Sequence, residues 1–246
     1  PTNWKQYFSK SKAKMVQQFD SVQAKTLMRL MQQEKAYWTP TLQTLKFEAN
    51  AHKNEFTDNE NLKYVTKVRK RLWWKYDTDH NKEKNLERKG ISVSEQFFEA
   101  SKKQVAMAHR MGVPIMAGTD VTDSYVFAGF SLHDELYELT SSGLTNLEAL
   151  QSATMVPATY SNAIEDYGTI EIGKKADLVL LNKNPLHDIK NTKSIKGVLL
   201  NGVYYDEEKL IELKAFTASA AGSFHFNVKT FLSLLNSPLI RVQFAD

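Results

Sequence analysis

The chain has 246 residues and a mass of 28.1 kDa, enough for one large domain or two small ones with a buried core. It contains no cysteine, which excludes a disulfide scaffold, thiol catalysis and cysteine-ligated metal sites but leaves the compartment open between cytoplasm and periplasm. No apolar run approaches the roughly 18 residues of a membrane span, and the net charge of +4 alone predicts no nucleic-acid partner.

The first half of the chain predicts helices that alternate with short strands. Apolar residues at helical spacing predict a helix over 24–31, and the aromatic and β-branched run at 36–42 is typical of a strand. Ser92 and Glu95 have the spacing of a capping box, so a helix is expected to begin there. A short apolar strand is expected next, at 113–120, and it ends in small residues and a carboxylate.

Two more helices are expected between this strand and residue 155. Leucines at helical spacing form a stripe over 132–139 that ends at Gly143, and Thr145 with Glu148 provides a second capping box. Helices that alternate with strands imply parallel strands joined by helical crossovers, and therefore an α/β layer.

From about residue 164 the pattern becomes that of β structure. Short strands are expected at 168–172, 176–182 and 197–205, and Asn201-Gly202 supplies the type I′ turn of a hairpin within the last of them. An apolar stripe over 228–235 then predicts a helix near the end of the chain.

The clearest chemical signal is Asp120, which ends the predicted strand in the order Gly118-Thr119-Asp120. Functional residues of parallel α/β sheets and barrels gather at the carboxyl ends of the strands, where a carboxylate can serve as a metal ligand or a general base. The residues alone leave a second interpretation open, because aspartate also favours turns and would then only cap the one that follows.

Longer motifs connect this signal to a known family. From residue 27 to residue 205 the chain resembles the metal-dependent amidohydrolase superfamily, near its imidazolonepropionase-like and prolidase-like branch. The motifs that carry the resemblance are Trp38-Thr39-Pro40-Thr41-Leu42, the segment 112–120, Ser131-Leu132-His133-Asp134-Glu135-Leu136, the segment 143–150 with Ala153-Thr154 and Pro157-Ala158, and the closing segment Gly168-Thr169-Ile170 to Leu181.

The resemblance implies an α/β fold with a partial (β/α)8 barrel, comprising its last strands and helices, followed by the C-terminal part of a small β-sandwich. Residues 1–163 would form the barrel part, with a basic helical insertion at about 47–90. Residues 164–205 would form the sandwich part, and 206–246 a helical tail. In this assignment the predicted strands at 36–42 and 113–120 are barrel strands seven and eight.

The resemblance also assigns Asp120 a role. It implies that Asp120 ligates a divalent metal, with zinc expected as one or two ions, and carries a proton from the attacking water to the leaving nitrogen. The implied activity is hydrolysis of an amide or cyclic amide C–N bond in a small molecule.

Members of this superfamily also use a His-x-His pair, a lysine or carboxylate, and two more histidines, none of which can be placed here. The chain is therefore expected to be the C-terminal part of a larger enzyme, to need the missing N-terminal part of the same polypeptide, and to be inactive alone. The alternative is a non-catalytic, degenerate barrel fragment that acts as a binding or assembly module.

Two other residues have a weaker case for substrate contact. His133 lies one turn into the helix after the second strand, where it either contacts substrate or lines and supports the mouth of the site. Thr41, at the end of the first strand, either contacts substrate or makes backbone hydrogen bonds. The five remaining histidines are not expected to be ligands: His52, His80, His109, His187 and His225.

Residues 61–90 form a basic segment that contains ten Lys or Arg residues against four acidic ones, with Trp73 and Trp74 among them. Three interpretations are open: a solvated helical insertion, a lid over the active site that favours anionic substrates, and a nucleic-acid surface. Because no recognised nucleic-acid motif accompanies the charges, we expect neither a nucleic-acid nor a membrane partner, while a homo-oligomer is left open.

Overall fold

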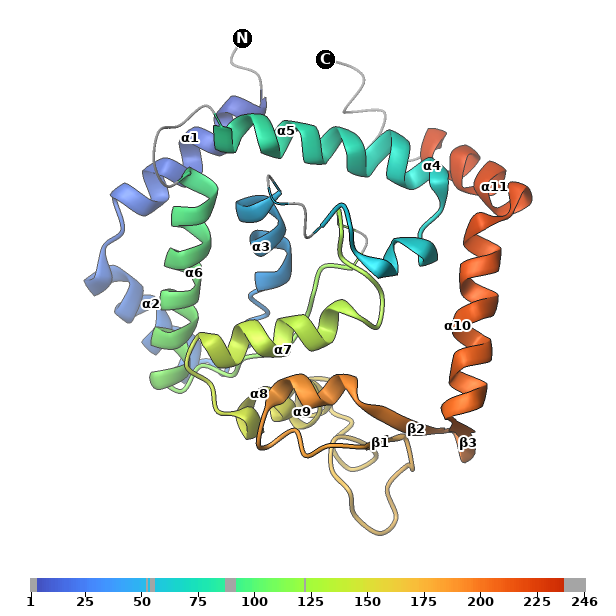
Figure 1. Ribbon diagram of the computed structural model, residues 1–246. Coiled ribbons are helices and arrows are strands. Elements are labelled where there is room, and N and C mark those ends of the chain that lie inside the picture. The colour runs from blue at the N-terminus through green and yellow to red at the C-terminus, as the bar shows by residue number, and fades with distance from the viewer. Residues whose placement is uncertain (1–3, 52, 54–55, 87–91, 122, 237–246) are drawn as a thin grey trace.

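The computed structural model describes residues 4–51, 53, 56–86, 92–121 and 123–236, and their side chains except at 4–8 and 82–86. His52 and parts of the predicted insertion and tail lie outside these residues. The fold is α/β, as predicted, with many helices and one small sheet (Figure 1). In chain order the elements are α1 (Trp4–Gln17), α2 (Ser21–Gln33), α3 (Leu42–Asn50), η1 (Glu60–Tyr64), α4 (Lys67–Arg69), η2 (Lys70–Trp74), α5 (Lys75–Leu86), α6 (Val93–Arg110), α7 (Ser131–Ser141), α8 (Asn146–Ser152), α9 (Met155–Tyr160), β1 (Leu178–Leu181), η3 (Ile189–Lys193), β2 (Ile195–Leu200), β3 (Val203–Asp206), α10 (Glu207–Gly222) and α11 (Phe224–Leu235).

The two predicted strands of the first half lie side by side as parallel extended segments. Trp38 and Ile115 form a parallel bridge between them. The backbone N–H of Trp38 donates to the Pro114 carbonyl over 3.0 Å, and the N–H of Met116 donates to the Trp38 carbonyl over 2.9 Å. The carboxyl ends of the two segments therefore lie at the same edge.

The ladder between these segments is shorter than the strands expected at 36–42 and 113–120. Within the described residues it is a single bridge with no third strand beside it, and an isolated pair of strands is only marginally stable. The absence of a side chain at Gly118 allows the close approach, because a Cβ atom there would lie 2.4 Å from Cγ2 of Thr39.

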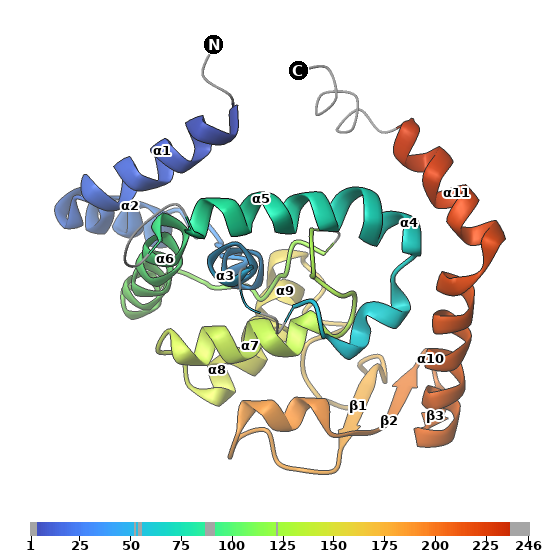
Figure 2. The same ribbon diagram turned by 45° about the horizontal axis from the view of Figure 1, so that its top comes forward.

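Helix α3 follows the first extended segment and lies at the centre of the helical part. Figures 1 and 2 both show α3 between α5 and α7, with α6 along a third side. Burial of apolar side chains is the main favourable term in holding these helices together. The largest buried cluster joins residues of α2, α3, α6, α7, the 113–115 segment and the loop after α7: Met28, Leu42, Ala49, Phe98, Val105, Ala108, Val113, Ile115, Leu139 and Leu144.

Both predicted capping boxes are confirmed. At the start of α6 the hydroxyl of Ser92 accepts the N–H of Glu95, and the Glu95 carboxylate accepts the N–H of Ser92. Thr145 and Glu148 make the same pair of hydrogen bonds at the start of α8. Each box satisfies backbone donors that a helix start otherwise leaves unpaired, so these two boundaries follow from local sequence.

Helix α7 is present where the sequence predicts it, but its buried face is rotated from the predicted leucine stripe. Leu132 is exposed, whereas Glu135 and Leu139 are fully buried. The buried residues of the helix are Ser131, Glu135, Leu136, Glu138 and Leu139. Polar side chains that find partners inside the fold, described below, account for the difference.

The sheet has the order β1-β2-β3 with antiparallel pairs throughout. Asn201 and Gly202 connect β2 to β3 with φ values of 50° and 77°. A type I′ turn requires positive φ at both central residues, so the predicted hairpin is confirmed.

The strand predicted at 168–172 is wrong, because the structure has bends and irregular backbone there that lead into a turn at 172. Gly168 has a φ of 92°, and a Cβ atom on it would lie 2.9 Å from the Cβ of Ala158. The side chains of Ile170 and Ile172 are exposed, and no described segment pairs with this stretch. A β-branched run forms a strand only where a neighbour supplies hydrogen bonds and a surface to cover.

The C-terminal helices form an arm that continues directly from the sheet. Asp206 ends β3, pairs with Gly197, and accepts the N–H of Lys209 as the N-cap of α10. Helix α10 then runs from the sheet towards α4, and α11 continues from its end at an angle (Figures 1 and 2). None of the described helices has the length and apolar character needed to cross a membrane.

Candidate active site

Asp120 lies just past the carboxyl end of the second extended segment. Its φ of 54° is in the left-handed region, which is uncommon for a residue with a side chain and turns the backbone sharply. Its carbonyl accepts the N–H of Asp123 over 3.1 Å, so the backbone of Asp120 closes a turn. The residue is exposed, and its carboxylate has no hydrogen bond or ion pair within the described residues. The turn and a chemical role of the carboxylate are therefore compatible.

Thr41 occupies the corresponding place after the first extended segment. It is the N-cap residue of α3 with a φ of 49°, and its side chain makes no capping hydrogen bond. One turn later, the hydroxyl of Thr44 donates to the Thr119 carbonyl over 3.2 Å. This contact holds the start of α3 against the residue before Asp120, so Thr41 and Asp120 lie at the same edge of the fold.

Glu135, which sequence analysis missed, caps α3 in place of Thr41. The two oxygens of its carboxylate accept the backbone N–H groups of Leu42 at 3.0 Å and Gln43 at 2.7 Å. Glu135 has no exposed surface, and this burial raises the pKa of its carboxyl to about 7, although the two N–H donors oppose the rise. Helix α7, which follows the Asp120 segment, is thereby tied to the end of the other segment.

The sequence carried one signal for Glu135. It lies four residues before Leu139 on a helix expected to be amphipathic, so a carboxylate stands on the face that turns inward. Its partners, however, lie more than ninety residues earlier in the chain. No local pattern identifies them.

A second unexpected carboxyl group lies in the turn after Asp120. Asp123 accepts the N–H of Ser124 over 2.8 Å. Burial raises the pKa of its carboxyl to about 6, with further contributions from the negative charges of Asp77, Glu48 and Asp120. The carboxyl groups of Asp120 and Asp123 in this turn, Asp77 of the insertion and Glu48 of α3 therefore lie close enough to influence one another.

His133 lies in the first turn of α7, as predicted, but it lines a cavity that does not include Asp120. Its Nδ1 atom is buried and has no hydrogen-bond partner in the described part of the chain. Burial lowers the pKa of the imidazole, and the positive charge of Lys193 lowers it further. The cavity has a volume of about 550 Å³ and is also lined by Lys193 and Asp134, which form an ion pair at 2.5 Å. Neither Thr41 nor Asp120 lines it.

The side chains present do not by themselves fit a metal centre. Across the described residues no three His, Asp or Glu side chains come together in a way that would hold a metal ion. Asp120 therefore offers one carboxylate, and a complete site for a divalent ion such as zinc needs three or four protein ligands.

The basic segment is helical where the structure describes it, through η1, α4, η2 and α5. Trp74 is 2% exposed, and its ring packs in an aromatic cluster against Tyr125 and Phe127, with ring centroids 4.9 and 5.5 Å apart. Its indole is thus part of the fold and is not displayed for stacking on bases. The insertion instead packs directly on the loop that follows Asp120.

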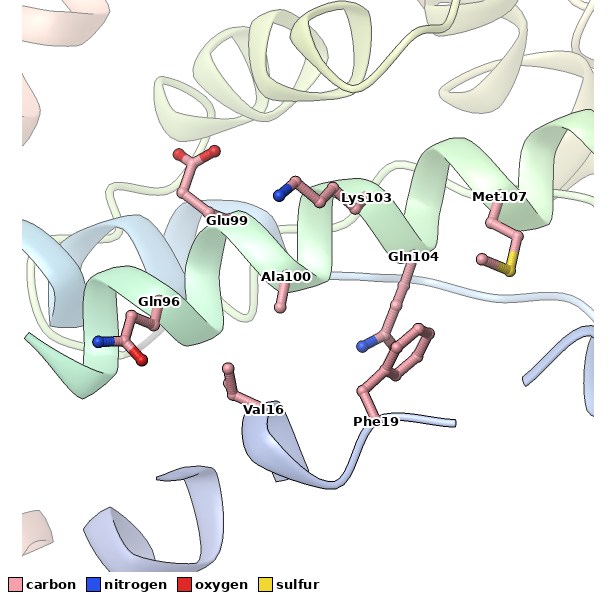
Figure 3. A pocket seen from close by; sticks show the side chains of 8 residues that line it. All are labelled: Val16, Phe19, Gln96, Glu99, Ala100, Lys103, Gln104 and Met107. Atoms are coloured by element: carbon pink, nitrogen blue, oxygen red, sulfur yellow. The ribbon is translucent and has the colours of Figure 1, made fainter. Parts of the chain in front are cut away.

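A second cavity, of about 510 Å³, lies on the outer side of α6. Figure 3 shows Val16, from the last turn of α1, and Phe19, from the connection between α1 and α2, across from Ala100 and Gln104 of α6. No residue of the two extended segments or of the loop after Asp120 lines this cavity. It is separate from the candidate site.

Known proteins resemble this chain in sequence and fold. The profile of the Amidohydrolase family matches residues 43–204. The fold is similar to that of bottromycin amidohydrolase, at 27% identity and a TM-score of 0.60, over 76% of this chain and 40% of that one. It is also similar to a Xaa-Pro dipeptidase with methionine bound in its active site, at 24% identity and a TM-score of 0.51, over 73% of this chain and 36% of that one.

The chain thus spans well under half the length of these two solved structures. No curated protein sequence matches it. The family profile, by contrast, covers well over half of the chain, from α3 to β3, and includes both Asp120 and Glu135. On this evidence the chain belongs to the Amidohydrolase family.

Proposed function

We propose that this chain is the C-terminal portion of a metal-dependent amidohydrolase that hydrolyses an amide or cyclic amide C–N bond in a small molecule. Membership of the Amidohydrolase family supports a hydrolase. The observation that carries the assignment is the exposed carboxylate of Asp120 at the edge shared by two parallel extended segments. Catalytic groups of α/β barrels come from the carboxyl ends of strands.

In this proposal residues 36–42 and 113–120 are neighbouring strands of a (β/α)8 barrel, and α6 is the crossover helix between them. Residues 1–163 would belong to the barrel, with the insertion at 47–90, and 164–205 to a β-sandwich. The parallel bridge supports the barrel assignment, because parallel strands require a helical crossover of the kind that α6 provides.

Asp120 is the catalytic group that this chain contributes. Members of the family generally use divalent metals, and a bound metal of this kind supplies water that ionises near neutral pH. The carboxylate of Asp120 would be one ligand and would accept a proton from water and deliver it to the leaving nitrogen. In this proposal the metal is zinc, and its remaining ligands come from outside these 246 residues.

Thr41 and His133 have different places in this proposal. Thr41 lies at the same edge as Asp120 and would contact the substrate. His133 supports the mouth of the site from the first turn of α7, since the cavity that it lines does not include Asp120.

Elemental analysis of metal content tests the proposal, on this chain and on the longest polypeptide that the surrounding gene encodes. We expect about one or two zinc ions per long polypeptide, their loss on Asp120→Ala, and no stoichiometric zinc in this chain alone. Asp166→Ala is the matched control, because Asp166 is an exposed aspartate in a turn remote in sequence from the proposed ligand.

Absence of metal from both polypeptides would contradict the proposal. The chain would then be a non-catalytic fragment of the fold that acts in binding or assembly, and Asp120 would have only its role in the turn. Retention of zinc by the Asp120→Ala variant would refute the role of Asp120 specifically, while leaving a metal-dependent hydrolase in place.

A further inference from the structure

A cavity of about 430 Å³ lies between the basic insertion, the loop after Asp120 and the C-terminal arm. Ligand-binding cavities have volumes of about 300–1,000 Å³ and are mostly apolar with a few polar groups. Its lining includes Arg69 and Trp74 of the insertion, Val121, Val126 and Phe127 of the loop, and Lys214 and Phe226 of the arm. Arg69 and Lys214 are the charged members of this set, and no carboxylate belongs to it.

Two hydrogen-bond donors at this cavity have no partner. Nε1 of Trp74 and Nε of Arg69 are both buried, and neither donates a hydrogen bond within the described part of the chain. Arg69 also has no ion pair with a described acidic side chain. A buried donor without an acceptor is costly, and a buried part of a guanidinium more so, which makes an acceptor from outside the chain favourable.

A π-helical turn places these two donors together. Residues Lys70–Trp74 form η2, in which the N–H of Lys75 bonds to the carbonyl of Lys70. Arg69 and Trp74 are five residues apart, which is about 1.4 turns of an α-helix but close to one turn where bonds join residues five apart. The wider turn therefore brings both side chains to one face, where they line the same cavity.

The C-terminal arm closes the other side of the cavity. Asn227 accepts the N–H of Val68 over 3.1 Å, and its amide donates to the carbonyls of Ala221 and Ser223. These bonds join the start of α11 to α4 and fix the turn between α10 and α11. Lys214 from α10 and Phe226 from α11 are thereby held over the insertion.

We propose that this cavity binds a small carboxylate that carries a bulky apolar group. The carboxylate would accept hydrogen bonds from Arg69 and Trp74, with Lys214 adding positive charge, because a guanidinium and a carboxylate form strong, charge-assisted hydrogen bonds. The apolar group would pack on Val126, Phe127 and their aromatic neighbours, which are already buried.

This inference deepens the proposed function, on which its catalytic meaning rests. Val121, which lines the cavity, directly follows Asp120. A ligand held here would therefore contact the residue that follows the proposed catalytic carboxylate, and the substrate class becomes an amide that also carries a separate free carboxylate beside a bulky apolar group. The basic insertion and the arm would set this preference.

Isothermal titration calorimetry of this chain with 3-phenylpropanoate, without metal, tests the inference. We expect saturable binding, with 3-phenylpropanamide and acetate at least tenfold weaker because each lacks one half of the recognised group. Arg69→Gln should weaken binding at least tenfold. Trp74→Phe, which keeps an aromatic ring and removes the N–H, should weaken it at least threefold.

Arg71→Gln is the matched control, because it removes the same charge from an exposed position of the same helical turn that does not line the cavity. It should change affinity less than twofold. Equal losses in the Arg69 and Arg71 variants, equal affinity for acid and amide, or no binding at all would overturn the inference. Circular dichroism identifies unfolded variants, and the probe comparison on the unaltered chain tests the inference without any variant. Because the titration requires neither metal nor turnover, a failure of the proposed hydrolase activity leaves its result unaffected.

Discussion

Glu135→Gln tests how α7 holds the start of α3 at the candidate site. The carboxyl group of Glu135 is fully buried with a pKa of about 7, against an ordinary value of 4.5. Between these two pH values the unfolded chain ionises Glu135 while the folded chain keeps it protonated. The free energy of unfolding therefore falls as pH rises from 4.5 through 7, by about 3 kcal/mol in total, and this contribution is fully present only below pH 4.5.

The glutamine side chain in this variant does not ionise, so the variant lacks this part of the pH dependence. At pH 4 the variant should be about 1 kcal/mol less stable, because glutamine has only one side-chain oxygen. One of the backbone N–H groups of Leu42 and Gln43 would then face the amide NH2 group and lose its acceptor. By pH 8 the loss should disappear or reverse, since the buried charge is gone.

Urea unfolding followed by circular dichroism, from pH 4 to 8 at one protein concentration, measures the difference between the two curves. Glu99→Gln, which removes an exposed carboxylate from α6, should leave the shape of the curve unchanged. Parallel curves for the original chain and Glu135→Gln would refute the reasoning, because they would mean that Glu135 has the same pKa in the folded and unfolded chains.

Three further predictions use the same unfolding assay. The free energy of unfolding of the original chain should fall by about 1–2 kcal/mol as pH rises from 3.8 through 6, a value reduced for the partial exposure of Asp123, and Asp123→Asn should abolish this fall. An unchanged pH profile in the variant would contradict the raised pKa. Glu138→Gln should destabilise by about 1–2 kcal/mol, and less in 1 M NaCl, because the buried carboxylate pairs with lysines of α3 and α6 at 3.1 and 3.7 Å; salt-independent loss would point to packing instead. Gly118→Ala should lower the free energy of unfolding by about 1–3 kcal/mol, because the new Cβ clashes with Thr39. Thr39→Ser removes the clashing methyl and should restore most of this loss in the double variant with Gly118→Ala. It should restore nothing when combined with Gly129→Ala, since a Cβ at Gly129 meets no neighbour.

Features whose causes lie within a few residues were predictable from the sequence. The capping boxes at Ser92 and Thr145 and the hairpin turn at Asn201-Gly202 depend on hydrogen bonds and backbone angles inside a four-residue window. The place of Asp120 at the end of an extended segment followed from the short apolar run before it, and the Amidohydrolase family was identified from longer motifs.

Features that depend on distant partners were not predictable. The contact of Glu135 with the start of α3 joins residues more than ninety positions apart, and the burial of Trp74 depends on the loop at 125–127. The run at 168–172 has strand-forming residues but no described neighbour to pair with, so its local preference does not decide its structure. The metal role of Asp120 stays a prediction, since no cluster of metal-ligating side chains is found among the described residues.

The chain changes element twice near its end without an intervening loop. Asp206 belongs to β3 and caps α10, and Ser223 ends α10 and caps α11. Each junction is fixed by a capping hydrogen bond, and Asn227 holds the second one against α4. A displacement of α10 would therefore carry α11 with it, so that Lys214 and Phe226, which line the cavity from the arm, would move as one wall.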